Sequence, residues 1–372
     1  MRYIFFTNTN LAVGAGIEKA LVNYVSHGKG KDIIVIQSQF YAARRMDEQT
    51  IQDLNAKIVT IHDYEHCISF LRQHTFTLPF YEFILPFVVR YTKFHNRKSL
   101  RNFGEADAVY LFKNEYWPLF HAKVIVGSNH GQFAFDNFFT KVLSLFVKAG
   151  IFYRGINAFH LFPRSAQIGD RMGKKYFTTP IGIDTKNYVP VARNALINIL
   201  FVGRLEHIKG IDIFIEVSSR FVNRSDVKFH IAGGGSYASH LQNAISCNVQ
   251  YHGTLDEKDL AQLYGSCDIF LYPTRWDAFP TVVVEAASAG DHIITSEKMS
   301  GVFDDLKNLG YLEYVDLNVD SICARLEKAI SSMVSIRASS AAEHSYVSEK
   351  YDNSVVSEKL FRSMEELYSS ES

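Results

Sequence analysis

The chain has 372 residues, 47% of them hydrophobic, which is enough for two domains with separate cores. Its 39 basic side chains (Lys and Arg) equal its 39 acidic ones, so the molecule as a whole has no net charge to attract nucleic acid. The charges are unevenly divided, because residues 1–190 hold 23 basic and 14 acidic side chains and the remainder hold 16 and 25. A basic first half and an acidic second half favour two domains with different partners, neither of them nucleic acid.

The cysteines and the apolar runs indicate the cellular compartment of the protein. Four cysteines lie far apart in the sequence without the spacing of zinc ligands, which predicts reduced thiols and a cytoplasmic location. The apolar residues at 3–6 are too few for a signal peptide. No run reaches the roughly 18 apolar residues that a membrane-spanning helix needs. We therefore expect a soluble protein, or one bound peripherally at the inner face of a membrane.

Strand and helix patterns alternate along both halves, as in parallel sheets of the doubly wound type. In the first half the pattern predicts a strand at 3–7, a helix at 17–27, and strands at 32–37, 108–112 and 124–127. A turn-rich strand is expected at 179–185, which includes Pro180 and Gly182. In the second half it predicts strands at 198–202, 228–232 and 268–272, and helices at 211–221 and 237–246.

Pro190 interrupts the pattern between the halves, which predicts a first domain over 1–188 and a second over 189–345. Residues 346–372 form a polar segment whose apolar positions recur at helical spacing. We expect this last helix to pack back on the first domain.

Two loops of the first half could approach a ligand. Gly14, Ala15 and Gly16 precede the first helix, where small residues let backbone N–H groups reach an anion, although the dinucleotide fingerprint is absent. His130 follows the strand at 124–127. A histidine there serves structure more often than chemistry, but the edge of a sheet favours a function.

The loop after the first strand of the second half carries two cations. Gly203 lets the backbone come close to a ligand, and Arg204 and Lys209, five residues apart, can hold a diphosphate from two directions. The alternative is a solvated loop with ordinary charges.

A second charged loop follows the strand at 268–272. Pro280 stands where a first helical residue is favoured and Gly290 where a helix stops, so Asp277 lies before a helix and Glu285 lies in it. Thr281 and Glu285 are four residues apart and share a helical face. The alternative makes Asp277 a helix cap and Glu285 a solvated residue. Because this loop and the Arg204–Lys209 loop follow strands of one sheet, we expect both at the same carboxyl edge, which favours a ligand site.

Taken in order, these motifs resemble those of the retaining nucleotide-sugar glycosyltransferases of the GT-B fold, family four (glycosyl transferases group 1). The resemblance is strong over about 180–295 and weaker in the first half, and its motifs stand at 180–184, 203–210, 231–235, 252–253, 273–274 and 277–285. It implies two Rossmann-like, doubly wound parallel-sheet domains that face each other across a cleft. The donor would bind mainly to the second domain and the acceptor to the first.

The resemblance also implies roles for individual residues. Arg204 and Lys209 would bind the diphosphate, Asp277 the hydroxyls of the donor sugar, and His130 would sit beside both, which makes these four the catalytic set. Glu285 would bind the ribose. The donor-binding set is Gly14, Ala15, Gly16, Gly203, Gly253, Thr254, Leu255, Ala278, Phe279, Pro280, Thr281 and Glu285. The donor would be a UDP- or GDP-sugar, with no metal and no other cofactor. The family usually has Glu where this chain has Asp277, which shortens the reach to the sugar by one methylene.

Segments 76–101 and 138–162 combine aromatic and basic residues, as suits a lipid-linked or glycan acceptor at an anionic membrane surface. The alternative is that the aromatic residues face the core and the charges are solvated. Two other functions remain open: a nucleotide-sugar epimerase of the same architecture, and a sugar- or nucleotide-binding protein without catalysis.

Overall fold

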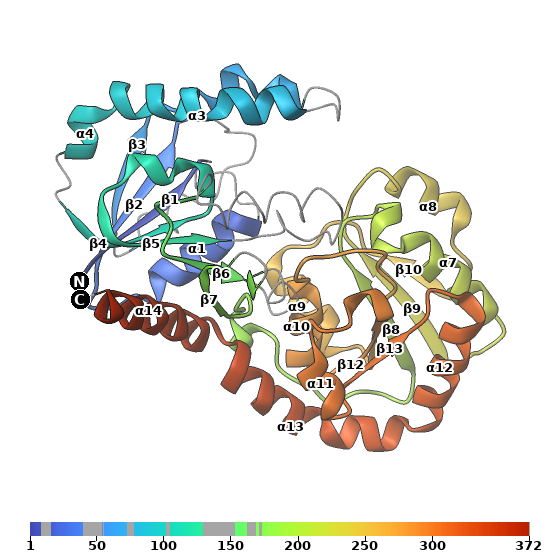
Figure 1. Ribbon diagram of the computed structural model, residues 1–372. Coiled ribbons are helices and arrows are strands. Elements are labelled where there is room, and N and C mark those ends of the chain that lie inside the picture. Colours follow the sequence, from blue (N-terminus) through green and yellow to red (C-terminus); the bar gives the residue numbers. More distant parts are fainter. Residues whose placement is uncertain are drawn as a thin grey trace. The chain divides into compact units, whose positions relative to one another are not determined.

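The computed structural model describes residues 1–8, 16–39, 54, 56–72, 78–101, 105–128, 153–161, 169–170 and 173–371. The chain forms two compact units (Figure 1). The first contains residues 1–180 and 356–372, and the second contains residues 181–355.

The first unit is built on a parallel sheet with the order β3-β2-β1-β4-β5-β6-β7. Its strands are β1 (Arg2–Thr7), β2 (Asp32–Ser38), β3 (Lys57–Ile61), β4 (Ala106–Leu111), β5 (Ala122–Ser128), β6 (Ala158–Leu161) and β7 (Lys175–Thr178). The strands expected at 3–7, 32–37, 108–112 and 124–127 are thus confirmed. The region expected to be a strand at 179–185 contains only an isolated bridge, between Ile183 and Asp352. Pro180 has no N–H to donate to a ladder, which accounts for the correction.

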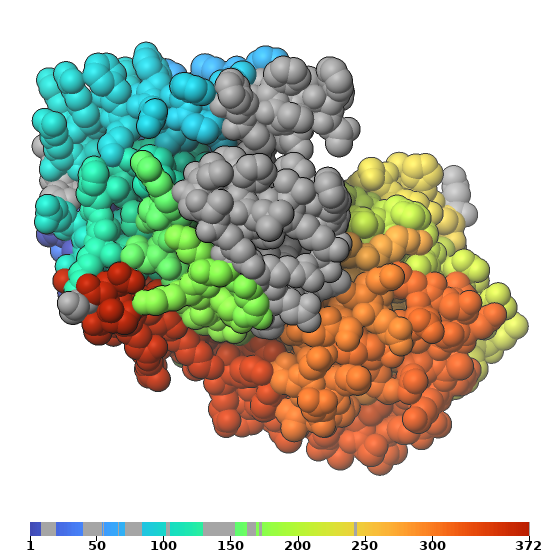
Figure 2. Space-filling view, viewed as in Figure 1, coloured from blue at the N-terminus to red at the C-terminus, as the bar shows by residue number. Residues whose placement is uncertain are grey.

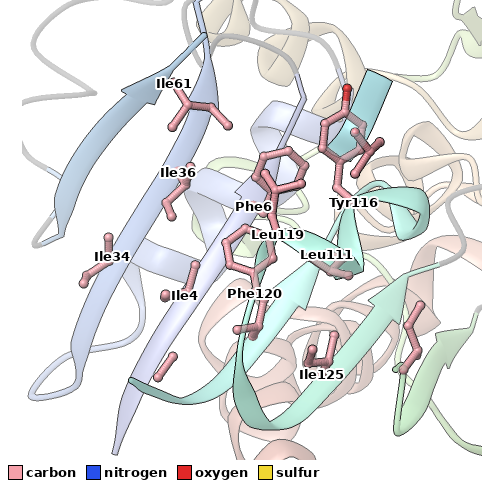
Figure 3. Packing of buried hydrophobic residues seen from close by; sticks show 14 of the residues in the cluster. Ile4, Phe6, Ile34, Ile36, Ile61, Leu111, Tyr116, Leu119, Phe120 and Ile125 are labelled. Atoms are coloured by element: carbon pink, nitrogen blue, oxygen red, sulfur yellow. The ribbon is translucent and has the colours of Figure 1, made fainter. Parts of the chain in front are cut away.

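Helices cover both faces of this sheet (Figure 1). One face carries α3 (Leu78–His95) and α4 (Arg97–Arg101), and the other carries α1 (Gly16–Ser26) and α14 (Asn353–Ser370). Alternate residues of each strand point to opposite faces, so Ile4 and Phe6 lie on one face of the sheet (Figure 3). They belong to the same core as Leu85 and Val89 of α3. Short 3-10 helices connect the strands: η2 (Glu65–Cys67), η3 (Ser69–Arg72) and η4 (Asn114–Leu119).

The opposite face of the sheet receives α14. The ring of Phe361 meets those of Tyr3 and Phe5, with centroids 5.0 and 5.8 Å away. Beside them Glu365 accepts hydrogen bonds from the Tyr3 hydroxyl at 2.7 Å and from the Lys31 ammonium at 2.6 Å. The last helix therefore completes the core of the unit that contains the first strand.

The second unit is also a parallel sheet with helices, in the order β10-β9-β8-β11-β12-β13. Its strands are β8 (Ile197–Val202), β9 (Val227–Ala232), β10 (Val249–Tyr251), β11 (Ile269–Tyr272), β12 (His292–Ser296) and β13 (Leu312–Val315). Its helices are α7 (Ile211–Arg220), α8 (Ala238–Ala244), α9 (Glu257–Gly265), α10 (Thr281–Ser288), α11 (Asp304–Asn308), α12 (Val319–Ser331) and α13 (Met333–Tyr351). Three 3-10 turns complete the unit: η6 (Thr185–Asn187), η7 (His207–Lys209) and η8 (Glu297–Met299). Both units are therefore Rossmann-like, as expected.

Replacing Phe361 with Ala should destabilise the first unit by about 3–5 kcal/mol, because it removes a buried ring and leaves a cavity against Tyr3 and Phe5. Unfolding in urea, followed by Trp117 fluorescence in a Trp276→Phe background, measures this unit alone. Phe70→Ala is the control, since that ring is 61% exposed and its loss should cost less than about 0.5 kcal/mol. Equal midpoints for the two variants would show that α14 does not stabilise the unit.

Candidate functional site

The sheet of the second unit has its first strand in the middle. Because β9 and β11 lie on opposite sides of β8, the chain leaves the carboxyl ends of β8 and β11 in opposite directions. In open parallel sheets a crevice forms at this point, and ligands bind there. The loops after these strands carry the charged residues identified in the sequence.

Glycines hold the neighbouring loops close together. The Gly203 N–H donates to Ala232 O at 3.2 Å, and the Gly233 N–H donates to Gly253 O at 2.7 Å. Gly233 has a φ of 130°, and a Cβ there would lie 2.0 Å from Gly203 O. Only glycine fits this position, so the loops after β8, β9 and β10 form one backbone surface at the carboxyl edge.

Lys209 and Asp277 meet between the loops after β8 and β11. The Lys209 ammonium lies 2.6 Å from Asp277 Oδ2, and the Tyr272 hydroxyl donates to the same oxygen at 3.0 Å. The Lys209 side chain is only 10% exposed. Gly210, with a φ of 79°, permits this approach, because a Cβ there would stand 1.9 Å from Pro273 O. Burial first, and then the nearby carboxylate, raise the pKa of Tyr272 well above its usual value, so its hydroxyl stays a donor.

Glu285 also accepts a hydrogen bond from a buried tyrosine. The Tyr264 hydroxyl, from the end of α9, lies 3.1 Å from Glu285 Oε2. Burial and the charge of Glu285 raise the pKa of Tyr264 well above its usual value. Thr281 and Glu285 are both half-buried and stand one turn apart on α10. The carboxylate is thus held in place by Tyr264, on a side chain that is not fully buried.

Arg204 has a different environment. Its side chain is 66% exposed, and its Nη1 donates to both carboxylate oxygens of Glu206 at 2.8 Å. The guanidinium is therefore accessible to a ligand, but it already has an acidic partner.

The family model described as Glycosyl transferases group 1 matches residues 191–343. Those residues form a group 1 glycosyl transferase domain. Among curated proteins, an uncharacterized glycosyltransferase of Methanocaldococcus jannaschii is 29% identical over 139 residues, which are 36% of this chain and 35% of the relative. The matched part thus spans about a third of that relative's length.

Solved structures extend the likeness to both units. Sucrose-phosphate synthase from Thermosynechococcus elongatus superposes with a TM-score of 0.73 at 10% identity and covers 100% of each chain. The Anabaena protein Alr3699/HepE in complex with UDP gives 0.71 at 13% identity, over 98% of this chain and 100% of that one. At these identities the likeness concerns the fold, which is that of the GT-B glycosyltransferases.

Within the group 1 domain, the structure brings together Arg204, Lys209 and Asp277 on adjoining loops. The interpretation of Asp277 as a helix cap is wrong, because Pro280 is the N-terminal cap of α10 and Asp277 binds Lys209. The Phe279 ring is buried against Phe303. A ligand at this helix start would therefore meet the backbone of Phe279 rather than its ring.

The other expected donor-site residues fall in two groups. Gly253, Thr254 and Leu255 follow β10, while Ala278, Pro280 and Thr281 lie at the start of α10. In the first unit, Gly16 is the first residue of α1. Gly14, Ala15 and His130 lie outside the described residues.

Sequence reasoning missed the partners of the charged residues, namely Tyr264, Tyr272 and Glu206. Tyr272 is the last residue of β11, and the sequence already predicts that the carboxyl end of this strand lies at the site. Its position in the sequence could therefore have identified it. Tyr264 has no comparable signal, because 21 residues separate it from Glu285 and only the packing of α9 against α10 joins them.

A histidine pair beside this edge gives a prediction for acid stability. His230 Nδ1 lies 3.0 Å from His252 Nε2, and burial, with the nearby His252 and Lys228 charges, lowers the pKa of His230 to about 4. The unfolded state, with a histidine pKa near 6.5, then binds more protons between about pH 6.5 and 4. The free energy of unfolding should therefore decrease as the pH is lowered through that window, by at most about 1.4 kcal/mol per pH unit for this proton.

Replacing His230 with Gln should flatten that part of the profile, because Gln keeps hydrogen bonding without titrating. Unfolding is followed by Trp276 fluorescence in a Trp117→Phe background. The exposed His240→Gln variant serves as the control. If the free energy of unfolding changes equally with pH in the wild type and in His230→Gln, the histidine pair does not cause the acid sensitivity.

Proposed function

We propose that this protein is a retaining glycosyltransferase that moves a sugar from a UDP- or GDP-sugar to an acceptor hydroxyl. The observation that carries the proposal is the meeting of Lys209 and Asp277, 2.6 Å apart, at the strand crevice of a group 1 domain. Glu285, held by Tyr264, provides a second carboxylate on the helix that begins there. The likeness to a fold neighbour whose structure contains UDP supports a nucleotide-sugar donor.

In this proposal the two cations bind the donor diphosphate. The bond between the anomeric carbon and the phosphate oxygen breaks as the acceptor oxygen bonds to the same face of that carbon. The acceptor proton passes to the leaving phosphate. Lys209 and Arg204 stabilise the negative charge that develops on the diphosphate, so the reaction needs no divalent metal.

Asp277 would receive the hydroxyls of the donor sugar. Its Oδ2 already accepts from Lys209 and Tyr272, and a carboxylate oxygen can accept more than one hydrogen bond. Its short side chain keeps the carboxylate next to Lys209. The donor sugar would therefore have to approach this ion pair closely. Gly203, Gly253, Thr254, Leu255 and the backbone of 278–281 would complete the part of the donor site that the second unit provides. The donor roles that the resemblance implies for Gly14, Ala15, Gly16 and His130 stay predictions.

Replacing either Lys209 or Arg204 with Ala should lower kcat/KM by at least about 100-fold, because each removes a charge that stabilises the leaving diphosphate. The donor is chosen first by thermal stabilisation with UDP, GDP and ADP and then with their sugars. Release of the nucleotide from that sugar is then measured with and without EDTA. Lys258→Ala, an exposed change on α9, is the control. Activity near wild type in either variant, with the unfolding midpoint unchanged, would refute the phosphate assignment.

Replacing Glu285 with Ala should weaken UDP or GDP binding by about tenfold, through loss of hydrogen bonds between the carboxylate and the ribose. Tyr264→Phe should have a smaller effect in the same direction, because it loosens the carboxylate without removing it. Calorimetry with the nucleotide and with its 2′-deoxy form measures both effects.

Glu216→Ala, an exposed carboxylate change on α7, is the matched control. The preference for the ribonucleotide should shrink only in the variants of Glu285 and Tyr264. An unchanged preference in Glu285→Ala would place the ribose elsewhere.

The first unit would bind the acceptor, a glycan or a lipid-linked molecule at the cytoplasmic face of a membrane. On α3, Phe87, Tyr91 and Phe94 are 61, 53 and 63% exposed, while Leu85 and Val89 enter the core. Exposed basic residues accompany them at Arg90, Arg97, Lys98 and Arg101. Figure 2 shows the α3 region at the surface of this unit. Aromatic and basic side chains together suit an anionic membrane.

Most of the second aromatic segment, 138–162, lies outside the described residues. Among the helices of the described ranges, none is long and apolar enough to cross a bilayer.

Product analysis separates the remaining alternatives. An epimerase would convert the donor sugar without any acceptor, and a binding protein would leave it intact. A transferase forms a glycoside only when an acceptor is supplied.

A further inference from the structure

The first unit contains a cavity away from the carboxyl edge of its sheet. It has a volume of about 450 Å³, which lies within the range of small-molecule sites. The cavity lies between α3, α4 and the sheet. Glu105 and His121, which line one end, immediately precede β4 and β5, so this end is at the amino edge. Thr7, the last residue of β1, stands at the opposite, carboxyl edge.

The walls of the cavity are apolar and basic in separate parts. The apolar part consists of Ile4 on β1, Ile36 on β2 and Phe120, which follows η4. Figure 3 shows these three side chains in the main core of the unit. Lys93, Arg97 and Arg101 provide the basic part, with Glu105 as the single carboxylate among the lining residues. A ligand that matches both parts must have an anionic group and an apolar group.

The three cationic side chains differ in the partners that they already have within the protein. The Lys93 ammonium donates to Pro118 O and lies 3.3 Å from His121 Nε2. Over the described ranges, neither Arg97 nor Arg101 forms an ion pair. A guanidinium can bind phosphate with two parallel hydrogen bonds. The cavity therefore offers two arginines to an anionic group.

The cavity is continuous with the exposed face of α3. The Arg97 guanidinium lies over the ring of Phe94, 4.9 Å from its centroid, and Arg97 also lines the cavity. Phe94 is 63% exposed and follows Tyr91 along the helix. A molecule in the cavity would thus sit next to a surface that suits a membrane, which favours a lipid over a soluble anion.

We propose that this cavity binds one anionic phospholipid. Arg97 and Arg101 hold the phosphate, and Leu100, Ile4 and Phe120 contact the apolar part next to it. The site adds a specific lipid to the proposed membrane contact. It does not depend on sugar transfer, because none of the residues that line the cavity belongs to the proposed donor site.

The test compares two double variants, each of which removes two positive charges from the α3–α4 region. Arg97→Gln with Arg101→Gln changes the cavity, whereas Arg90→Gln with Lys98→Gln changes exposed residues that do not line it. The 372-residue protein is titrated with dihexanoyl-phosphatidylglycerol below its micelle concentration, without donor, and thermal stabilisation is recorded. We expect at least about a tenfold loss of affinity in the first double variant and little change in the second.

The proposal would be overturned by equal losses in both double variants, by no stabilisation of the wild type, or by equal stabilisation with inorganic phosphate. A third variant, Leu100→Trp, fills the cavity from α4 without changing charge. It should abolish binding of the soluble lipid, and it should still sediment with phosphatidylglycerol vesicles through the exposed face of α3. Unchanged binding in this variant would place the lipid elsewhere, and the loss of sugar transfer in any variant has no bearing on the outcome.

Discussion

The order of strands around β8 is the constraint on which the rest of the second unit depends. The first strand of the unit lies in the middle of the sheet, with the next strands added on one side and the later ones on the other. The chain must therefore leave β8 and β11 in opposite directions, and this opens a crevice between their loops. The glycines at 210 and 233 then let these loops approach to distances that no other residue allows. The positions of Arg204, Lys209 and Asp277 all follow from this arrangement.

The electrostatics of the crevice consist of partnered charges. Lys209 is neutralised by Asp277, and Arg204 by Glu206, so the loops do not hold two bare cations next to each other. The two ion pairs differ in how easily a ligand can separate them. The Arg204 pair is exposed, and such pairs contribute at most about 1 kcal/mol, so an incoming phosphate can replace Glu206 easily. The Lys209 pair is buried and is reinforced by Tyr272, so a ligand would bind to the pair as a whole.

The sequence predicts the fold best where apolar runs are fully buried. The strand at 198–202 is buried at every position, as a strand flanked by two others should be, and it was foreseen almost to the residue. The edge strands β3 and β7 are half-exposed and mix Lys, Thr and Tyr with apolar residues, so their pattern does not stand out. At the site, the loops that follow strands could be placed at one edge from their order alone. The hydrogen bond from Tyr264 to Glu285 could not, because it depends on how one helix packs against another.

The return of α14 to the first sheet has a consequence for synthesis of the chain. The second unit is continuous in sequence, from 181 to 355, and can close its core as soon as those residues have left the ribosome. The first unit cannot, since Tyr3 and Phe5 are covered by Phe361, which is translated after the whole second unit. The half that is translated first is thus the half that finishes folding last. Until then, one face of its sheet depends on α1 alone or on a chaperone to stay out of contact with other chains.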